Sequence, residues 1–151
     1  AEHVIELGTC VGISTRYLNN QTKGKLYTFE GSPEIQKIAM REPRPSKTTF
    51  ILGQIKETLP QLLTQIQKVD FALIDANHTY DGTMFAFNAL LAKAHQKSIF
   101  VIGDIHWTAG MEQAWKEIRT HPQVKLTMDF YECGIVFFDY PGGKTDLILD
   151  I

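Results

Sequence analysis

The sequence predicts an α/β fold in which a doubly wound, mostly parallel sheet of seven strands carries helices on its faces. Short apolar runs alternate five times with helical patterns, which is the order of a parallel sheet with crossover helices. A turn bracketed by two glycines joins the first apolar run to the first helical pattern. The last two runs are separated by so few residues that only an antiparallel hairpin can join them.

The opening stretch, residues 4–15, organises the rest of this prediction. Its first half has the pattern of a buried strand, and its second half opens a helix with Ile13, Tyr17 and Leu18 at helical spacing. Gly8 and Gly12 bracket the turn between them, where the lack of a Cβ lets the backbone approach a ligand. A strand, a glycine turn and a helix N-terminus form a site for a nucleotide-like ligand. The same pattern also fits a turn that needs glycine only for its backbone angles.

The other elements follow in order along the chain. Strands are predicted at residues 26–29, 48–52, 70–75, 98–102, 124–131 and 134–140. Helices are predicted at residues 13–22, from Ser32, from Thr58, at 80–95 and from Thr108. Ser32 and Thr108 carry hydroxyls that can cap their helices. The helix from Ser32 has Ile35, Ile38 and Ala39 as its expected buried stripe and ends at Pro43 and Pro45.

Composition narrows the class of protein. The chain has 151 residues, 44% hydrophobic and 21% charged, which is typical of one globular domain spanning residues 1–151. A net charge of −2 gives no footprint for nucleic acid, and no apolar run is long enough to span a membrane. Cys10 and Cys133 are too few for a disulfide framework, which fits a cytoplasmic protein. Because the chain opens almost directly in a core strand, we expect that an upstream segment is missing.

Acidic residues stand where three predicted strands end, which is the edge at which open parallel sheets bind ligands. Glu30 follows the second strand about 20 residues after the glycine turn and can accept both hydroxyls of a ribose. Asp75 and Asp104 end two later strands and can share a divalent cation, orient a substrate or hold a positive charge on a cofactor. Asp75 or Asp104 taken singly fits a helix cap or a loop ion pair equally well, and Glu30 also fits a solvated acid before a helix N-terminus.

Two histidines follow these acids directly. His78 comes three residues after Asp75, and His106 comes two residues after Asp104. Histidine can take up a proton near neutral pH, so both are candidate catalytic residues, although loop histidines are commonly surface residues. Trp107 could wall a substrate pocket beside them.

These motifs together resemble the class I S-adenosylmethionine-dependent methyltransferases. The run Glu6-Leu7-Gly8-Thr9-Cys10-Val11-Gly12-Ile13-Ser14-Thr15 is similar to the cofactor loop of the branch that contains catechol and caffeoyl-CoA O-methyltransferases and related bacterial proteins. The resemblance continues through residues 27–31, 71–78 and 103–107 and the closing hairpin. It implies a Rossmann-like fold with strand order 3-2-1-4-5-7-6.

The resemblance also implies roles for individual residues. Gly8, Thr9 and Gly12 would form the loop under the methionine part of the cofactor, with Glu6 and Ser14 helping to fix it. Glu30 would bind the ribose, and Gln54 would contact the adenine. Asp75 and Asp104 match two metal ligands of the branch, whereas Ile105 replaces the asparagine that is the third, so a magnesium requirement stays open. His78 aligns with the lysine that serves as base, with Asp104 and His106 as further catalytic candidates.

The function implied is methyl transfer from S-adenosylmethionine to a small-molecule acceptor, with oxygen as the expected acceptor atom. The upstream segment would supply helices that cover the cofactor and contact a second subunit in a homodimer. One alternative is an NAD(P)-binding oxidoreductase, but Cys10 and Ile13 stand where its fingerprint needs glycine. A second is a cofactor-binding module without catalysis. A nucleic-acid methyltransferase is disfavoured by the absence of a basic surplus.

Overall fold

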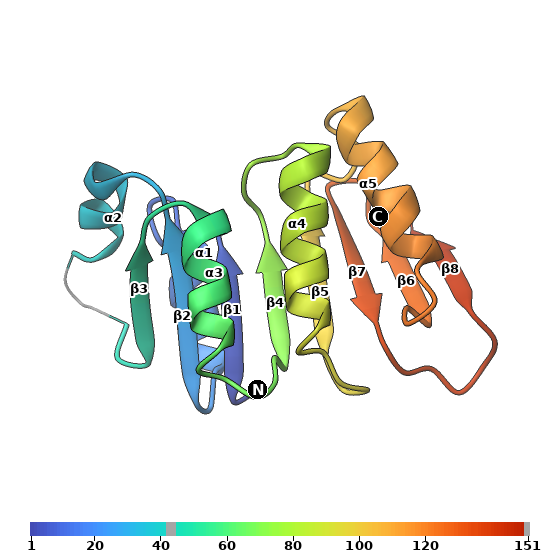
Figure 1. Ribbon diagram of the computed structural model, residues 1–151, viewed down its shortest axis with the longest axis horizontal. Coiled ribbons are helices and arrows are strands. Elements are labelled where there is room, and N and C mark those ends of the chain that lie inside the picture. Colours follow the sequence, from blue (N-terminus) through green and yellow to red (C-terminus); the bar gives the residue numbers. More distant parts are fainter. Residues whose placement is uncertain (42–44, 150–151) are drawn as a thin grey trace.

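The computed structural model describes residues 1–41 and 45–149 of the chain. Its centre is one sheet of eight strands in the order β3-β2-β1-β4-β5-β7-β6-β8. The strands are β1 (His3–Leu7), β2 (Lys25–Glu30), β3 (Thr48–Leu52), β4 (Phe71–Ile74), β5 (Ile99–Gly103), β6 (Leu126–Asp129), β7 (Cys133–Phe137) and β8 (Thr145–Ile148). The first five are parallel, so their carboxyl ends meet at one edge, the upper edge in Figure 1.

The predicted class and strand order are confirmed, with one addition. Strand β7 inserts antiparallel between β5 and β6, as the closing hairpin predicts. The sheet nevertheless has eight strands rather than seven, because β8 pairs parallel with the outer side of β6. Three of its four residues are exposed, so β8 lacks the apolar alternation by which a strand is recognised from sequence.

Five helices connect the strands. They are α1 (Ile13–Gln21), α2 (Pro33–Ala39), α3 (Ile55–Leu63), α4 (Tyr80–Leu91) and α5 (Ala109–Thr120). Helices α3, α4 and α5 lie side by side in front of the sheet in Figure 1, and α1 lies behind it. Ser32 and Thr108 cap α2 and α5 as expected, and Thr79 caps α4 in the same way. Helix α3 begins at Ile55, three residues before the predicted start, and α4 ends at Leu91 rather than at His95.

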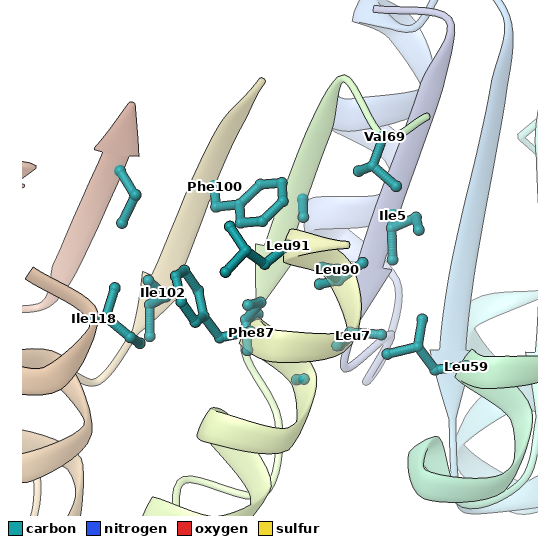
Figure 2. Close-up of a cluster of buried hydrophobic side chains, with 14 of the residues drawn as sticks. Ile5, Leu7, Leu59, Val69, Phe87, Leu90, Leu91, Phe100, Ile102 and Ile118 are labelled. Carbon is teal, nitrogen blue, oxygen red and sulfur yellow. The ribbon is translucent and has the colours of Figure 1, made fainter. Parts of the chain in front are cut away.

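The main core lies between the sheet and the layer of α3, α4 and α5 (Figure 2). Side chains from β1, β4 and β5 face those of α4, where Phe87 and Leu90 are fully buried. Phe87 meets Phe100 of β5 edge to face, with ring centroids 6.3 Å apart. This packing fixes the positions at which the central strands end, and therefore the loops that follow them.

The buried stripe predicted for α2 is confirmed at Ala39, which is 1% exposed, and is wrong at Ile35 and Ile38. Ile13 and Tyr17 of α1 are 65% and 73% exposed, and Ile35 and Ile38 of α2 are 37% and 41% exposed. The buried residues are Thr15 and Asn19 on α1, and Gln36 together with Ala39 on α2. The side chain of Asn19 accepts a hydrogen bond from the backbone N–H of Lys47 at 2.9 Å, so this face of α1 is held by polar contacts.

Two remaining expectations concern the end of α2 and the turn of the closing hairpin. Pro43, expected to end α2, lies outside the described residues. The turn of the closing hairpin covers residues 130–132, slightly earlier than predicted. Among the described residues, no helix has both the length and the apolar character that a membrane span requires.

Candidate active site at the carboxyl edge of the sheet

A buried carboxylate supports the glycine turn from below. Glu6 of β1 has no exposed surface, and its side chain accepts hydrogen bonds from the hydroxyls of Ser14 at 2.5 Å and of Thr15 and Thr28 at 2.6 Å. Burial raises the pKa of Glu6, and the charge of Asp75 raises it further, while the three hydroxyl donors act in the opposite direction. Glu6 therefore ties the start of α1 to strands β1 and β2.

The turn above Glu6 has a left-handed backbone. Gly8 has φ 103°, Cys10 φ 47° and Gly12 φ 82°. The N–H groups of Gly8 and Thr9 both donate to the carbonyl of Phe29, at 3.1 and 2.9 Å. The hydroxyl of Thr9 lies 2.6 Å from that of Thr28, in the same buried group that contains Glu6. The loop is therefore fixed to the end of β2 before any ligand binds.

A first cavity of about 320 Å³ opens beside this loop, within the usual size range of small-molecule pockets. Its walls come from the ends of β1 to β4, and four of its lining residues are Gly8, Glu30, Gln54 and Asp75. Glu30 is held by two backbone donors, Cys10 to one carboxylate oxygen at 2.9 Å and Ser32 to the other at 3.0 Å. Each oxygen keeps a second lone pair, so the carboxylate can still accept a pair of ligand hydroxyls.

A second group of side chains gathers where β4 and β5 end. The group consists of Asp75, His78 and Asp104, whose possible ligand atoms, one from each residue, all lie within 4.8 Å of one another. Within it, Nδ1 of His78 is 3.2 Å from Oδ2 of Asp104. Burial raises the pKa of Asp75, as does the charge of Asp104, whereas His78 acts to lower it. His78 and Asp104 also have positive φ, 23° and 54°. Such left-handed non-glycine residues concentrate at functional sites.

Gly103, the last residue of β5, makes room for this group. A Cβ atom at Gly103 would collide with the carboxylate of Asp75. Sequence reasoning missed this position, because the spacing of the chain does not reveal that the side chain of Asp75 crosses to the neighbouring strand.

His106 does not join Asp75 and Asp104. Its Nε2 atom lies 3.0 and 3.2 Å from the two carboxylate oxygens of Asp129, a buried residue at the end of β6. It nevertheless lines a second cavity of about 560 Å³, together with Asp104, Trp107, Tyr131 and Glu132. Sequence reasoning also missed Asp129, although an acid inside a buried strand was a signal that could have found it.

The predicted site residues thus fall into three groups. Gly8, Glu30, Gln54 and Asp75 line the first cavity. Glu6, Thr9, Gly12 and Ser14 form the loop and its support. His78 and Asp104 lie between the two cavities, and His106 lies in the wall of the second.

An α/β sheet of this order, with a glycine loop on β1 and an acid at the end of β2, defines the methyltransferase class of α/β domains. Consistent with this, the sequence profile of a methyltransferase-domain family matches residues 5–105. The chain belongs to this family. The oxidoreductase alternative is therefore not supported. Comparison with curated protein sequences gave no match.

Solved structures share the fold at low sequence identity. TomG, an O-methyltransferase from Streptomyces achromogenes solved with S-adenosylmethionine, superposes with a TM-score of 0.77 at 17% identity, over 93% of this chain and 74% of its own. An O-methyltransferase from Bacillus cereus solved with S-adenosylhomocysteine gives 0.75 at 19% identity, over 91% and 74%. MycE, a methyltransferase of mycinamycin biosynthesis solved with Mg, gives 0.68 at 15% identity, over 93% and 46%.

Proposed function

We propose that this chain binds S-adenosylmethionine and transfers a methyl group to an oxygen atom of a small molecule. The observation that carries the proposal is that each cavity contributes one carboxylate to the same cluster of side chains. Asp75 lines the first cavity and Asp104 lines the second, and both belong to the cluster within 4.8 Å. A methyl donor in the first cavity and an acceptor in the second would therefore come together at these carboxylates.

The lining of the first cavity fits a positively charged nucleoside. It includes the carboxylates of Glu30 and Asp75, and its described lining residues include neither lysine nor arginine. A dinucleotide would bring a negatively charged pyrophosphate next to those carboxylates, whereas a sulfonium ion is attracted by them. Glu30 would accept the ribose hydroxyls, and the amide of Gln54 would contact the base. TomG and the Bacillus cereus enzyme, which bind this cofactor or its product, support the assignment.

The bound cofactor supplies an activated methyl group, so the protein's part is to place the acceptor and manage its proton. We assign the base to His78. With the Nδ1–H of its ring directed at Asp104, the Nε2 atom is left to take the proton of an acceptor hydroxyl. Trp107 lies edge to face with the His78 ring, centroids 5.2 Å apart, and limits how the ring can turn. Asp104 thus acts by orienting His78.

The same residues have the donor set of a divalent cation site. Asp75 and Asp104 provide two carboxylates, a common number for magnesium, which fills its remaining positions with water. Ile105 cannot serve as a third ligand, because its hydrocarbon side chain has no atom that can coordinate a metal, and it is fully buried in the core. The cation would be held by Asp75 and Asp104 and would stabilise negative charge on the acceptor oxygen. MycE, with Mg in its structure, supports this assignment.

Calorimetry of the protein with S-adenosylhomocysteine tests the cofactor assignment. Glu30→Ala removes the proposed ribose contact and should raise Kd at least about 10-fold, since a hydrogen bond to a charged group is worth roughly 1.5–3 kcal/mol. Glu57→Ala, an exposed acid in the first turn of α3, is the matched control and should bind as the wild type does. No binding by the wild type would overturn the proposal.

Transfer of labelled methyl groups tests the reaction itself. The wild type is incubated with labelled S-adenosylmethionine and a panel of phenols and alcohols, and methylated products are identified by mass spectrometry. O-methylated product supports the proposal. Cofactor binding without transfer to any acceptor would instead support the second alternative, a binding module without catalysis.

A further inference from the structure

Asp129, which lies outside the Asp75–His78–Asp104 cluster, is bound by both side-chain and backbone groups. It ends β6, is 4% exposed and accepts hydrogen bonds from three different groups. Nε1 of Trp115 donates to one oxygen at 2.8 Å, and the N–H of Tyr131 donates to the other at 3.0 Å. His106 meets both oxygens, at 3.0 and 3.2 Å. Two of these three partners, His106 and Tyr131, line the second cavity.

These two partners also touch one another. The rings of His106 and Tyr131 stack with centroids 5.3 Å apart and planes 26° from parallel. The hydroxyphenyl ring is otherwise open to solvent, since Tyr131 is 71% exposed. The orientation of this ring therefore depends on what holds its backbone and on the ring of His106 beneath it. Asp129 holds both.

The turn that carries Tyr131 has a conformation that needs support. Tyr131 has φ 69°, and the N–H of Glu132 donates to the carbonyl of Phe130 at 2.8 Å, which makes a tight three-residue turn. A non-glycine residue keeps a positive φ only where contacts with the surrounding structure hold it there. The carbonyl of Glu132 in turn accepts the N–H of Asp104 at 2.7 Å. Asp129 thus connects through this turn to the acid between the cavities.

We propose that Asp129 is a positioning residue for the acceptor: it holds His106 and the Tyr131 turn in place and so builds the wall of the second cavity against which the acceptor lies. This inference rests on the proposed function, because that function makes the second cavity the acceptor site. The inference adds a residue that contacts neither the cofactor nor the acceptor. Asp129 acts through His106 and Tyr131, which line the proposed acceptor site.

The chain contains a matched control for a purely structural role. Asp70 lies just before β4, at the opposite edge of the sheet, and also serves several groups: the N–H of Glu2 at 2.6 Å, the N–H of His3 at 2.9 Å, Nε2 of His95 at 2.9 Å and, as an ion pair, Nζ of Lys68 at 3.3 Å. Asp70 lines neither the first nor the second cavity. Asp70→Asn therefore disturbs the same chemistry away from both cavities.

Steady-state kinetics with an acceptor from the panel separate the two roles. Asp129→Asn should raise KM for the acceptor about 10-fold or more, while kcat changes less than about 3-fold and the Kd for S-adenosylhomocysteine less than about 2-fold. Asp70→Asn should leave all three near wild-type values. An unchanged acceptor KM in Asp129→Asn, or an equal rise in Asp70→Asn, would overturn the inference.

A second measurement needs no acceptor. We compare ¹H–¹⁵N spectra of Asp129→Asn with those of the wild type. The backbone signals of Tyr131, Glu132 and Asp104 and the indole signal of Trp115 should shift. The signals of Gly8 and Glu30 should stay in place. Unmoved Tyr131 and Glu132 signals would overturn the inference even if no acceptor has been found. Failure of the wild type to bind cofactor would count against the proposed function alone.

A second variant guards against unfolding of Asp129→Asn. His106 is part-buried and lies outside the core, so His106→Asn removes the stacked ring without opening a core cavity. It should raise the acceptor KM in the same direction. A His106→Asn protein with wild-type KM would show that the wall does not position the acceptor.

Discussion

His78 and Asp104 stand 26 positions apart in the chain, yet Nδ1 of the histidine lies 3.2 Å from Oδ2 of the aspartate. Each residue follows a different parallel strand, and both have positive φ angles, 23° for His78 and 54° for Asp104. The pair lies beside Asp75, which lines the first cavity, and Asp104 itself lines the second. This contact orients the His78 ring, and we place the proton transfer at its other nitrogen, Nε2.

His78→Asn should leave cofactor binding intact and lower kcat by about 10²–10⁴-fold, the usual contribution of a general base. His121→Asn is the matched control, since His121 ends α5 away from both cavities. Kinetics with labelled cofactor provide the measurement. Wild-type kcat in His78→Asn would remove this histidine from the mechanism while leaving the methyltransferase assignment in place.

Gly103→Ala should damage the site without unfolding the protein. The added Cβ would push the carboxylate of Asp75 away from β5, and a displacement of about 1 Å at a reacting centre can lower the rate about 100-fold. Overpacking of this kind also lowers the free energy of unfolding, by about 1–3 kcal/mol. Gly143→Ala is the control, because no atom of residues 1–41 and 45–149, its chain neighbours apart, lies within 4 Å of a Cβ at that position. Equal activity of the two variants would contradict the role given to Gly103.

Cation binding should depend on both acids of the cluster. Titration of the cofactor-loaded protein with Mn²⁺, followed by electron paramagnetic resonance, should show one site that is lost in Asp75→Asn and Asp104→Asn. Asp139→Asn, an exposed aspartate after β7, should bind as the wild type does. If chelation with EDTA leaves turnover unchanged and Asp104→Asn still binds Mn²⁺, the cation has no place in this site.

Glu6 should make the protein's stability depend on pH. Its pKa in the fold is raised above the ordinary value of 4.5, chiefly by burial, so the folded state holds this proton more tightly than the unfolded chain does. The resulting stability is fully present below about pH 4.5 and is lost as the pH rises through the folded-state pKa. Glu6→Gln keeps the size and removes the titration. The difference in unfolding free energy between wild type and Glu6→Gln should therefore shrink as the pH rises.

Urea denaturation of both proteins at steps from pH 4 to pH 8 measures this difference. Groups common to the two chains cancel, so the comparison isolates Glu6. A difference that stays constant across the range would mean that the carboxyl group titrates alike in the folded and unfolded states.

The fold class could be predicted, and so could the polar residues that follow the parallel strands at one edge of the sheet. Both depend on local sequence pattern. Parallel strands end at a common edge, so Glu30, Asp75 and Asp104 were placed at one site from their positions alone. The helix caps at Ser32 and Thr108 were predictable for the same reason, since a cap needs only its own first turn.

Features that depend on pairing across the sheet could not be predicted in this way. Asp129 gains its partners from α5 and from the loop after β5, which no spacing in the sequence connects. Strand β8 forms because β6 offers a free edge, and its own residues are mostly exposed. On α2 the large apolar residues Ile35 and Ile38 are exposed although Ala39 is buried, so periodicity indicated the buried side only in part.

The two cavities are built from separate stretches of the chain. All the described residues lining the first lie between Gly8 and Asn77, and those lining the second lie between Asp104 and Glu132. The family match covers residues 5–105 and so ends where the second stretch begins. Under the proposed function, a lineage can retain its methyl donor while the later stretch diverges toward new acceptors. Exchanging residues 106–132 between relatives is then a direct way to move acceptor preference from one methyltransferase to another.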